Sequence, residues 1–278
     1  MDIPFVKMHG IGNDFVLLDC SAAVYDDLAY LARTLCRRRF GIGADGMLVL
    51  CPSTEADYRM RIFNADGTEA QICGNGLRCI AVYAYEHGIC RKCEPTVETR
   101  AGLRHIVLQT DSDSHVLSVT VDMGTAITDP QLIPVNTVTP FINSPVENCG
   151  EKIRLTALSV GNPHGVVFVD DLYDCRFESL GPRLECHEIW PEKANIEFVK
   201  VIDRHHIAMR AWERGVGETL ACGSGACAAA AAAVINSLAD WPVEVQLPGG
   251  QLTIDGSSGR LLMTGPATEV FSGKTFLK

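Results

Sequence analysis

Positive charge is scarce in this sequence. Its 278 residues contain 24 lysines and arginines against 34 aspartates and glutamates, which gives a formal net charge of −10. A partner with a phosphate backbone needs a basic protein surface, so the composition argues against nucleic-acid binding. A small anionic substrate remains compatible with it, because a buried site can be locally positive on an acidic protein.

Long apolar runs are also absent. The longest, residues 226–235, is mostly alanine and too short to span a bilayer. The first ten residues, MDIPFVKMHG, lack the basic segment and apolar stretch of a secretory signal. With 47% hydrophobic and 21% charged residues, the chain has ample material for a core. We therefore expect a globular, cytoplasmic protein with no membrane partner.

Cysteine, in contrast, is plentiful, with twelve residues. In a cytosolic chain of this size, catalysis, metal binding or packing explains such a count better than disulfides do. Cys90-x-x-Cys93 has metal or redox spacing, but no second CxxC or HxxxH supplies the other zinc ligands. We predict that this pair is a surface turn. A zinc- or redox-sensing binding protein remains an alternative.

An internal repeat at an offset of 149 residues organises the chain. The sequence CGNG at 73–76 recurs as CGSG at 222–225. Three further anchors match in the same register without gaps: Gly12-Asn13 with Gly161-Asn162, Met60-Arg61 with Met209-Arg210, and Phe63-Asn64 with Trp212-Glu213. Four matches in one register predict two copies of a structural unit of about 130 residues, paired as domains.

Each copy has the same order of strand, loop, CGxG motif and helix. Residues 58–63 and 206–212 alternate polar and apolar side chains, as half-buried strands do. The runs 77–88 and 226–237 are apolar on nearly every side, which predicts helices that are buried all round. Residues 26–39 indicate an additional surface helix.

The simplest architecture for this pattern is an α+β fold. We predict two pseudo-symmetric domains from an internal duplication, each a curled mixed β-sheet around a central buried helix, with the active site in the cleft between them. The predicted N-terminal domain comprises residues 1–122 plus 266–278 and carries Cys73. The predicted C-terminal domain comprises residues 123–265 and carries Cys222.

Each CGxG motif combines a thiol with an anion cradle. The first N–H groups of a helix are unpaired and lie at the positive end of its dipole, so a cysteine there is expected to have a lowered pKa. The glycines leave room for a carboxylate at those N–H groups. Two such thiols facing one cleft predict inversion of a stereocentre by two bases, with the helix starts stabilising the developing charge.

Other interpretations of these motifs were weighed. The two cysteines could be buried structural residues, or could form a disulfide with each other. The symmetric pair, flanked by the matched residues Asn64 and Glu213, favours catalysis. Residues 41–46 match the letters of a dinucleotide fingerprint, but they follow a basic helix and precede a strand, which is the wrong context.

Five co-linear motifs carry a family resemblance: KMHGIGNDFVLLD, FNADGTEAQICGNGLRC, SVGNPHG, NIEF and WERGVGETLACGSGAC. With them the sequence resembles the diaminopimelate epimerase family throughout its length. The resemblance implies an isomerase that interconverts LL- and meso-2,6-diaminoheptanedioate, a diamino dicarboxylic acid, for lysine and peptidoglycan precursors. It also implies a homodimer that uses neither pyridoxal phosphate nor a metal.

The same resemblance implies a role for each site residue. Cys73 would accept the proton from the LL substrate and Cys222 would donate one, with the roles exchanged in reverse. His164 and Glu213 would tune the protonation of the thiols. The implied substrate contacts are Asn13, Gly46, Asn64, Gly74, Asn75, Asn162, Asn195, Glu213, Arg214, Gly223 and Ser224.

Two positions depart from the family pattern. Some members carry Gln where this chain has Gly46, so one substrate contact is expected to be missing or replaced by water. A Tyr that some members place at the dimer contact is Phe271 here. A racemase of proline or hydroxyproline with two thiols is the alternative function. Phenazine-type isomerases share the fold but lack the paired cysteines.

Overall fold

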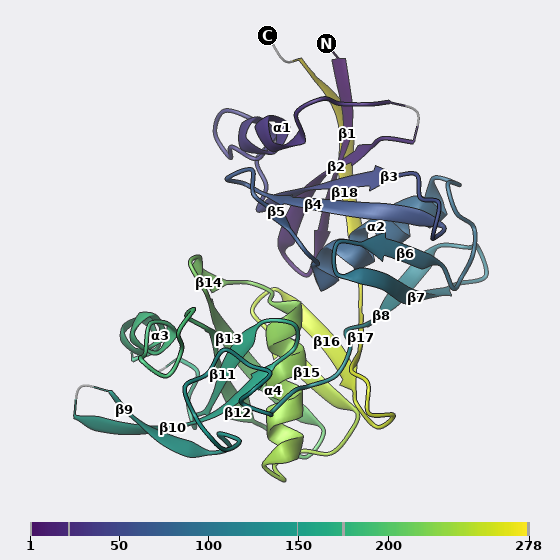
Figure 1. Ribbon diagram of the computed structural model, residues 1–278. Coiled ribbons are helices and arrows are strands. Elements are labelled where there is room, and N and C mark those ends of the chain that lie inside the picture. Colours follow the sequence, from purple (N-terminus) through teal and green to yellow (C-terminus); the bar gives the residue numbers. More distant parts are fainter. Residues whose placement is uncertain (1, 22, 149, 174–175, 277–278) are drawn as a thin grey trace. The chain divides into compact units, whose positions relative to one another are not determined.

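The computed structural model describes residues 2–21, 23–148, 150–173 and 176–276 (Figure 1). The chain divides into two compact units. Unit 1 is Met1–Asp122 together with Thr264–Lys278, and unit 2 is Met123–Met263. Each unit is built from a mixed β-sheet and, among the described residues, two helices.

Unit 1 opens with strand β1 (Asp2–Gly10) and closes with β18 (Thr268–Phe276), which pair antiparallel. The sheet continues from β1 through β2, β3, β4, β6, β7 and β8, with β5 on β4, and only the β2–β3 and β4–β6 pairs are parallel. The elements between β1 and β18 are β2 (Asn13–Asp19), α1 (Leu28–Leu35), β3 (Gly46–Cys51), β4 (Tyr58–Asn64), β5 (Glu69–Ala70), α2 (Gly74–Glu86), β6 (Thr96–Thr99), β7 (Gly102–Thr110) and β8 (Val116–Asp122).

Unit 2 repeats this plan. Its sheet runs β9, β10, β11, β12, β13, β15 and β16, with β14 on β13, and only the β11–β12 and β13–β15 pairs are parallel. The elements are β9 (Ser144–Asn148), β10 (Glu151–Ser159), β11 (Pro163–Phe168), α3 (Phe177–Glu185), β12 (Asn195–Val201), β13 (His206–Glu213), β14 (Gly217–Thr219), α4 (Gly223–Ile235), β15 (Val243–Leu247) and β16 (Gly250–Asp255). Strand β17 (Leu262–Gly265) leads the chain back to unit 1.

The offset of 149 residues predicted from sequence recurs in the elements themselves. Helix α2 starts at Gly74 and α4 at Gly223, and both have 13 residues. The order of antiparallel and parallel pairs is also the same, since β1–β2–β3–β4 corresponds to β10–β11–β12–β13. The predicted α+β fold with two pseudo-symmetric halves is therefore confirmed.

Helices α2 and α4 are the central helices of their units. Helix α2 contacts seven strands of unit 1, including β1, β8 and β18, and α4 contacts β10 to β13, β15 and β16. Every residue of α2 from Gly74 to Tyr85 is buried, as the apolar pattern predicted. In α4 the residues 228–233 are all alanine and all buried. Their short side chains let the surrounding strands approach the helix axis closely.

Helices α1 and α3 cover the other face of each sheet. In unit 1, Leu31 and Leu35 of α1 pack with Met47 and Val49 of β3. Because β3 is covered on both faces, its residues 46–50 are all buried, which is typical of strands enclosed between helices. Helix α1 is shorter than the predicted 26–39. Asp27 caps its start, and the N–H groups of residues 42 and 43 turn back to the Leu35 carbonyl.

Candidate active site

Cys73 and Cys222 are the N-caps of α2 and α4. Their backbones are extended, and each sulfur accepts a hydrogen bond from the glycine N–H three residues later, at 3.4 Å from Gly76 and 3.3 Å from Gly225. The N–H groups at the start of each helix lie next to its thiol, so either end is suited to a carboxylate ligand.

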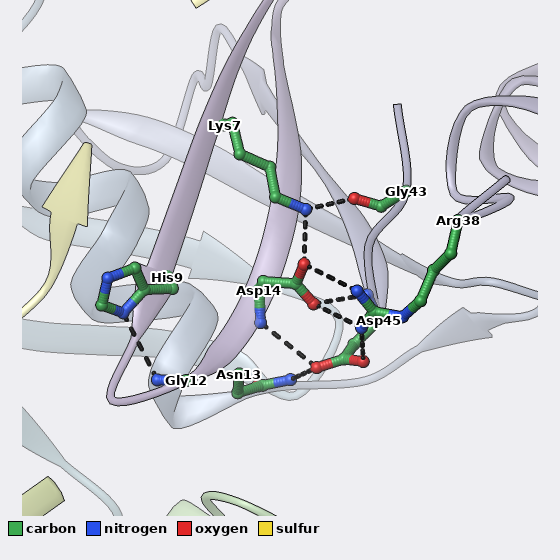
Figure 2. Close-up of polar contacts among 8 residues, drawn as sticks. All are labelled: Lys7, His9, Gly12, Asn13, Asp14, Arg38, Gly43 and Asp45. Carbon is green, nitrogen blue, oxygen red and sulfur yellow. Dashed lines mark hydrogen bonds and ion pairs between the residues drawn. The ribbon is translucent and has the colours of Figure 1, made fainter. Parts of the chain in front are cut away.

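In unit 1, three polar side chains surround the start of α2. The Asn13 Oδ1 lies 3.9 Å from the Cys73 sulfur and accepts a hydrogen bond of 3.1 Å from the buried Asn75 amide. The Asn13 Nδ2 in turn donates to Asp45 at 2.9 Å. Figure 2 shows this contact between Asn13 and Asp45, which fixes the orientation of the Asn13 amide. In that orientation the Asn13 oxygen faces the thiol.

Asp14, the residue after Asn13, lies within a cluster of charges that Figure 2 shows. Lys7 donates to the Asp14 carboxylate and to the Gly43 carbonyl, and Arg38 bridges Asp14 and Asp45. Burial of the Asp14 carboxyl tends to raise its pKa, but the hydrogen bonds from Arg38 and Lys7 outweigh it and lower the pKa to about 2. The cluster ties the β1–β2 turn to the loop before β3.

Two further predicted contacts lie at the ends of neighbouring strands. Gly46 opens β3 opposite Asn64, which closes β4. Asn64 is exposed, and its amide donates to the Thr68 hydroxyl at 2.9 Å. A Cβ added to Gly46 would stand 2.8 Å from the Phe63 carbonyl oxygen. The neighbouring backbone therefore leaves little room for a side chain at position 46.

In unit 2, His164 is fully buried on β11 rather than solvated in a loop. Its Nδ1 lies 2.8 Å from the Glu197 Oε1 and its Nε2 lies 2.9 Å from the Asn162 Oδ1. Glu197, on β12, is also 0% exposed. The sequence did not single out Glu197 as a site residue.

Glu213 and Ser224 lie beside Cys222. The Glu213 carboxylate accepts a hydrogen bond of 2.5 Å from the Thr219 hydroxyl, and the Ser224 oxygen is 3.7 Å from the Cys222 sulfur. Burial raises the pKa of the Glu213 carboxyl, and the nearby Glu197 raises it further, whereas His164 lowers it.

The predicted lowering of the thiol pKa is wrong for Cys222. Burial raises the pKa of this thiol well above its ordinary value, and the carboxylates of Glu213 and Glu197 add to that effect. The hydrogen bonds from Gly225 and Ser224 act in the opposite direction but are weaker. A helix start favours a thiolate only where water or a positive group balances the loss of solvation.

Asn195 and Arg214 complete the predicted set. The buried Asn195 accepts a hydrogen bond of 2.9 Å from the Arg214 N–H, and its own amide donates to the Pro163 carbonyl. The Arg214 side chain is exposed and donates to the Glu192 carbonyl at 3.1 Å. Asn195 thus joins β12 to the loop after β13, and Arg214 extends from that loop into solvent.

The structure brings the predicted residues together within each unit. Asn13, Cys73, Gly74 and Asn75 gather at the start of α2, and Asn162, His164, Glu213, Cys222, Gly223 and Ser224 gather at the start of α4. Asp45 and Glu197 are the additions that sequence reasoning missed. Glu197 corresponds to Leu48 at the repeat offset, so a charge in place of an apolar residue was the available signal.

The other described cysteines are spread over both units. Cys36, Cys79 and Cys227 are buried, Cys90 is half-buried and Cys93 is exposed, while Cys149 and Cys175 lie outside the described residues. Over the described ranges, no group of three or more histidine, cysteine, aspartate or glutamate side chains could hold a metal ion. Within the same ranges, no helix has the length and apolar character needed to cross a membrane.

Solved structures of proteins with two different names share this fold. A phenazine biosynthesis protein of the PhzF family from Bacillus anthracis matches with a TM-score of 0.73 at 18% identity, covering all of both chains. A probable proline racemase from Agrobacterium radiobacter matches with a TM-score of 0.72 at 15% identity, over 99% of this chain and 93% of that one. The fold class is therefore that of the PhzF proteins and proline racemases.

Sequence relatives define the family more narrowly. The family model for diaminopimelate epimerase matches residues 5–128 and 156–270. Proteins named diaminopimelate epimerase from Desulfovibrio desulfuricans and Moorella thermoacetica are each 46% identical to this chain; the first match covers 98% of both chains, the second 97% of this chain and 98% of the relative. This chain belongs to the diaminopimelate epimerase family. The predicted family and the predicted isomerase class are thus confirmed.

Proposed function

We propose that this chain interconverts LL- and meso-2,6-diaminoheptanedioate with Cys73 and Cys222 as its acid–base pair. The substrate follows from relatives that carry the family name over nearly their whole length. One observation carries the mechanism: α2 and α4 both begin directly after a cysteine whose sulfur accepts the same capping hydrogen bond. The reaction would serve lysine and peptidoglycan-precursor biosynthesis in the cytoplasm, where thiols stay reduced.

The proposed chemistry is a pair of proton transfers at one carbon. From the LL substrate, the Cys73 thiolate takes the α-proton, so a C–H bond breaks, an S–H bond forms and the electron pair moves toward the carboxylate. The Cys222 thiol then gives its proton to the opposite face of the carbon and becomes a thiolate. The reverse reaction exchanges the two roles, and proton return through solvent resets the enzyme.

The remaining site residues would bind the substrate and stabilise the transition state. The N–H groups at Gly74, Asn75, Gly223 and Ser224 would hold the carboxylate whose charge grows in the transition state. Asn13, Asn64, Asn162, Asn195 and Arg214 would hold the distal ammonium and carboxylate, because amides both donate and accept and a guanidinium grips a carboxylate at two points. His164 and Glu213 would set the protonation of Cys222.

Units 1 and 2 are, in this proposal, the two epimerase domains, and both must present their thiols to one substrate molecule. We also propose a homodimer. Phe271 on β18 is 48% exposed and makes an edge-to-face contact with Phe5, so about half of this residue's surface is accessible to a partner. Light scattering of wild type and Phe271→Asp would show a change from dimer to monomer.

Deuterium incorporation tests the function directly. The reduced protein is incubated with the LL substrate in deuterated water, without added cofactor, while exchange and stereochemistry are followed together. Meso product with deuterium at the inverted carbon is the expected result. No exchange with this substrate would overturn the proposal, and the same assay with proline and hydroxyproline would then test the racemase alternative.

Alanine variants of the two cysteines test the mechanism. Cys73→Ala and Cys222→Ala should each lose at least about a thousandfold in epimerisation, because each removes one member of an acid–base pair. Cys93→Ala is the control, since Cys93 is an exposed cysteine of unit 1. Full activity in either of the first two variants, with normal folding, would exclude the two-thiol mechanism.

A further inference from the structure

Glu197 is a buried carboxylate with one oxygen engaged and one bare. Its Oε1 lies 2.8 Å from the His164 Nδ1, and the side chains of both residues are 0% exposed. Its Oε2 is buried without a hydrogen-bond partner among the described residues. Burying a carboxylate in this way is unfavourable unless its charge is balanced, so a role for Glu197 must be sought in its neighbours.

The His164 ring faces an oxygen atom on each side. Its Nδ1 meets Glu197 and its Nε2 meets the Asn162 Oδ1 at 2.9 Å. These two contacts hold the ring in one orientation, between Glu197 on β12 and the residue before Pro163. His164 and Glu197 thus form a buried, hydrogen-bonded histidine–carboxylate pair.

The other copy of the fold has no charge at these positions. At the repeat offset, His164 corresponds to Phe15 and Glu197 to Leu48. Phe15 pairs with Gly46 as His164 pairs with Asn195. A Cβ on Gly76 would meet the Leu48 Cδ2 at 2.8 Å, and a Cβ on Gly225 would meet the Glu197 Oε1 at 2.8 Å. In unit 1 the same scaffold therefore accommodates an apolar pair at these positions.

Cys222 is the reactive group next to this pair. The same Cβ on Gly225 would stand 3.0 Å from the Cys222 sulfur, so the Glu197 oxygen and the thiol flank a single glycine. The charged groups that face Cys222 are Glu197 from β12 and Glu213 from β13, with His164 from β11 next to both carboxylates. At the two carboxylate positions, unit 1 has the uncharged residues Leu48 and Asn64.

We propose that Glu197 is a positioning residue that fixes His164 and, by its charge beside Cys222, keeps the proton on that thiol in the free enzyme. The inference rests on the proposed function, in which Cys222 donates to the LL substrate. Glu197 and Glu213 both raise the pKa of Cys222, after burial, which has the largest effect. The two copies of the fold thus place their cysteines in surroundings of different charge. Cys222, which donates the proton to the LL substrate, is the cysteine that lies beside the two carboxylates.

Alkylation of the two thiols without substrate tests this inference. Wild type and Glu197→Gln are treated with iodoacetamide at pH 8, and the Cys73 and Cys222 peptides are quantified by mass spectrometry. Loss of the charge should raise the Cys222 rate about tenfold, because only the thiolate reacts, and should leave the Cys73 rate unchanged. Glu244→Gln is the matched control, since Glu244 is a partly exposed carboxylate of the same unit on β15.

Two outcomes would overturn the inference. One is an unchanged Cys222 rate in Glu197→Gln, and the other is an equal rise at both cysteines, which would indicate general loosening. If Glu197→Gln does not fold, Glu197→Leu, which introduces the residue that unit 1 has at this position, takes its place with the same expected result.

A pH profile separates this inference from the proposed function. The high-pH limb of kcat/KM for the LL substrate, where Cys222 loses its proton, should move to lower pH in Glu197→Gln by about one unit. An inactive wild type would overturn the function while leaving the alkylation result to stand. An active wild type with an unmoved limb in Glu197→Gln would overturn the inference alone.

Discussion

Arg38 meets Asp14 at two points, with Nη2 2.8 Å from Oδ1 and Nη1 3.2 Å from Oδ2 (Figure 2). The ordinary pKa of an aspartate is 3.8, and that of Asp14 in the fold is about 2. Because the folded pKa is the lower one, the stability from this contact is complete above about pH 4 and is lost as the pH falls toward 2.

Asp14→Asn should therefore lower the free energy of unfolding at pH 7 by on the order of 2 kcal/mol, and by less at pH 3. Urea unfolding at both pH values, followed by circular dichroism, measures the difference. Tryptophan fluorescence reports on unit 2, because Trp190, Trp212 and Trp241 all lie there. It therefore serves as an internal control for unfolding outside unit 1, where Asp14 lies. A loss of equal size at pH 3 and pH 7 would contradict the lowered pKa of Asp14.

Asp45 is expected to act on substrate binding through Asn13. Without the hydrogen bond to Asp45, the Asn13 amide can rotate and its oxygen no longer has to face Cys73. Asp45→Ala should raise KM about three- to tenfold, which corresponds to the loss of one hydrogen bond, with a smaller effect on kcat. Asp45→Asn should recover part of the loss. Steady-state kinetics measures both constants. Asp113→Ala, at an exposed loop position, is the control for a nonspecific effect. An unchanged KM in Asp45→Ala would argue against Asn13 as a substrate contact.

Gly225 and Gly76 should respond differently to the same substitution. A methyl group on Gly225 meets Glu197, which His164 holds in place, and the Cys222 sulfur, whereas a methyl group on Gly76 meets the flexible end of Leu48. Gly225→Ala should destabilise the protein by about 1–3 kcal/mol through overpacking, and Gly76→Ala by less. The gain in helix propensity is the same in both helices, so thermal unfolding of the two variants compares the contacts alone. Equal losses would mean that Glu197 can move aside.

Gly181 is expected to be intolerant for a steric reason. A Cβ there would stand 2.7 Å from the Trp212 ring, and the ring is held by a hydrogen bond of 3.0 Å from its Nε1 to Glu185. Gly181→Ala should cost about 1–3 kcal/mol of unfolding free energy. Ser179→Ala, at an exposed position of the same helix, should cost less than about 0.5 kcal/mol. If both variants unfold at the wild-type temperature, α3 is not packed tightly on β13.

The duplication could be predicted from the sequence because its matching segments are unusual combinations of residues. A cysteine followed by two glycines at a helix start is rare enough that two copies at one offset define the register, and α2 and α4 begin where that register places them. The buried character of both helices followed from the absence of a polar face.

What sequence could not supply is the depth at which a polar side chain lies. Glu197 stands in the run NIEFV, where it looks like the solvent-facing residue of a half-buried strand. In the fold, both faces of β12 are covered and Asn195 to Val199 are all buried. The same limit explains the error at Cys222, because the helix start was visible in the sequence but the burial that outweighs it was not.

Strand β1 pairs with β18 from Asp2 opposite Phe276 to His9 opposite Thr268. This pairing affects the order in which the two units fold during translation. Unit 2 is complete once Met263 has emerged, whereas unit 1, although it is translated first, must wait for β18 before its sheet can close. The half that carries Cys222 can therefore fold first during synthesis, and the half that carries Cys73 closes last.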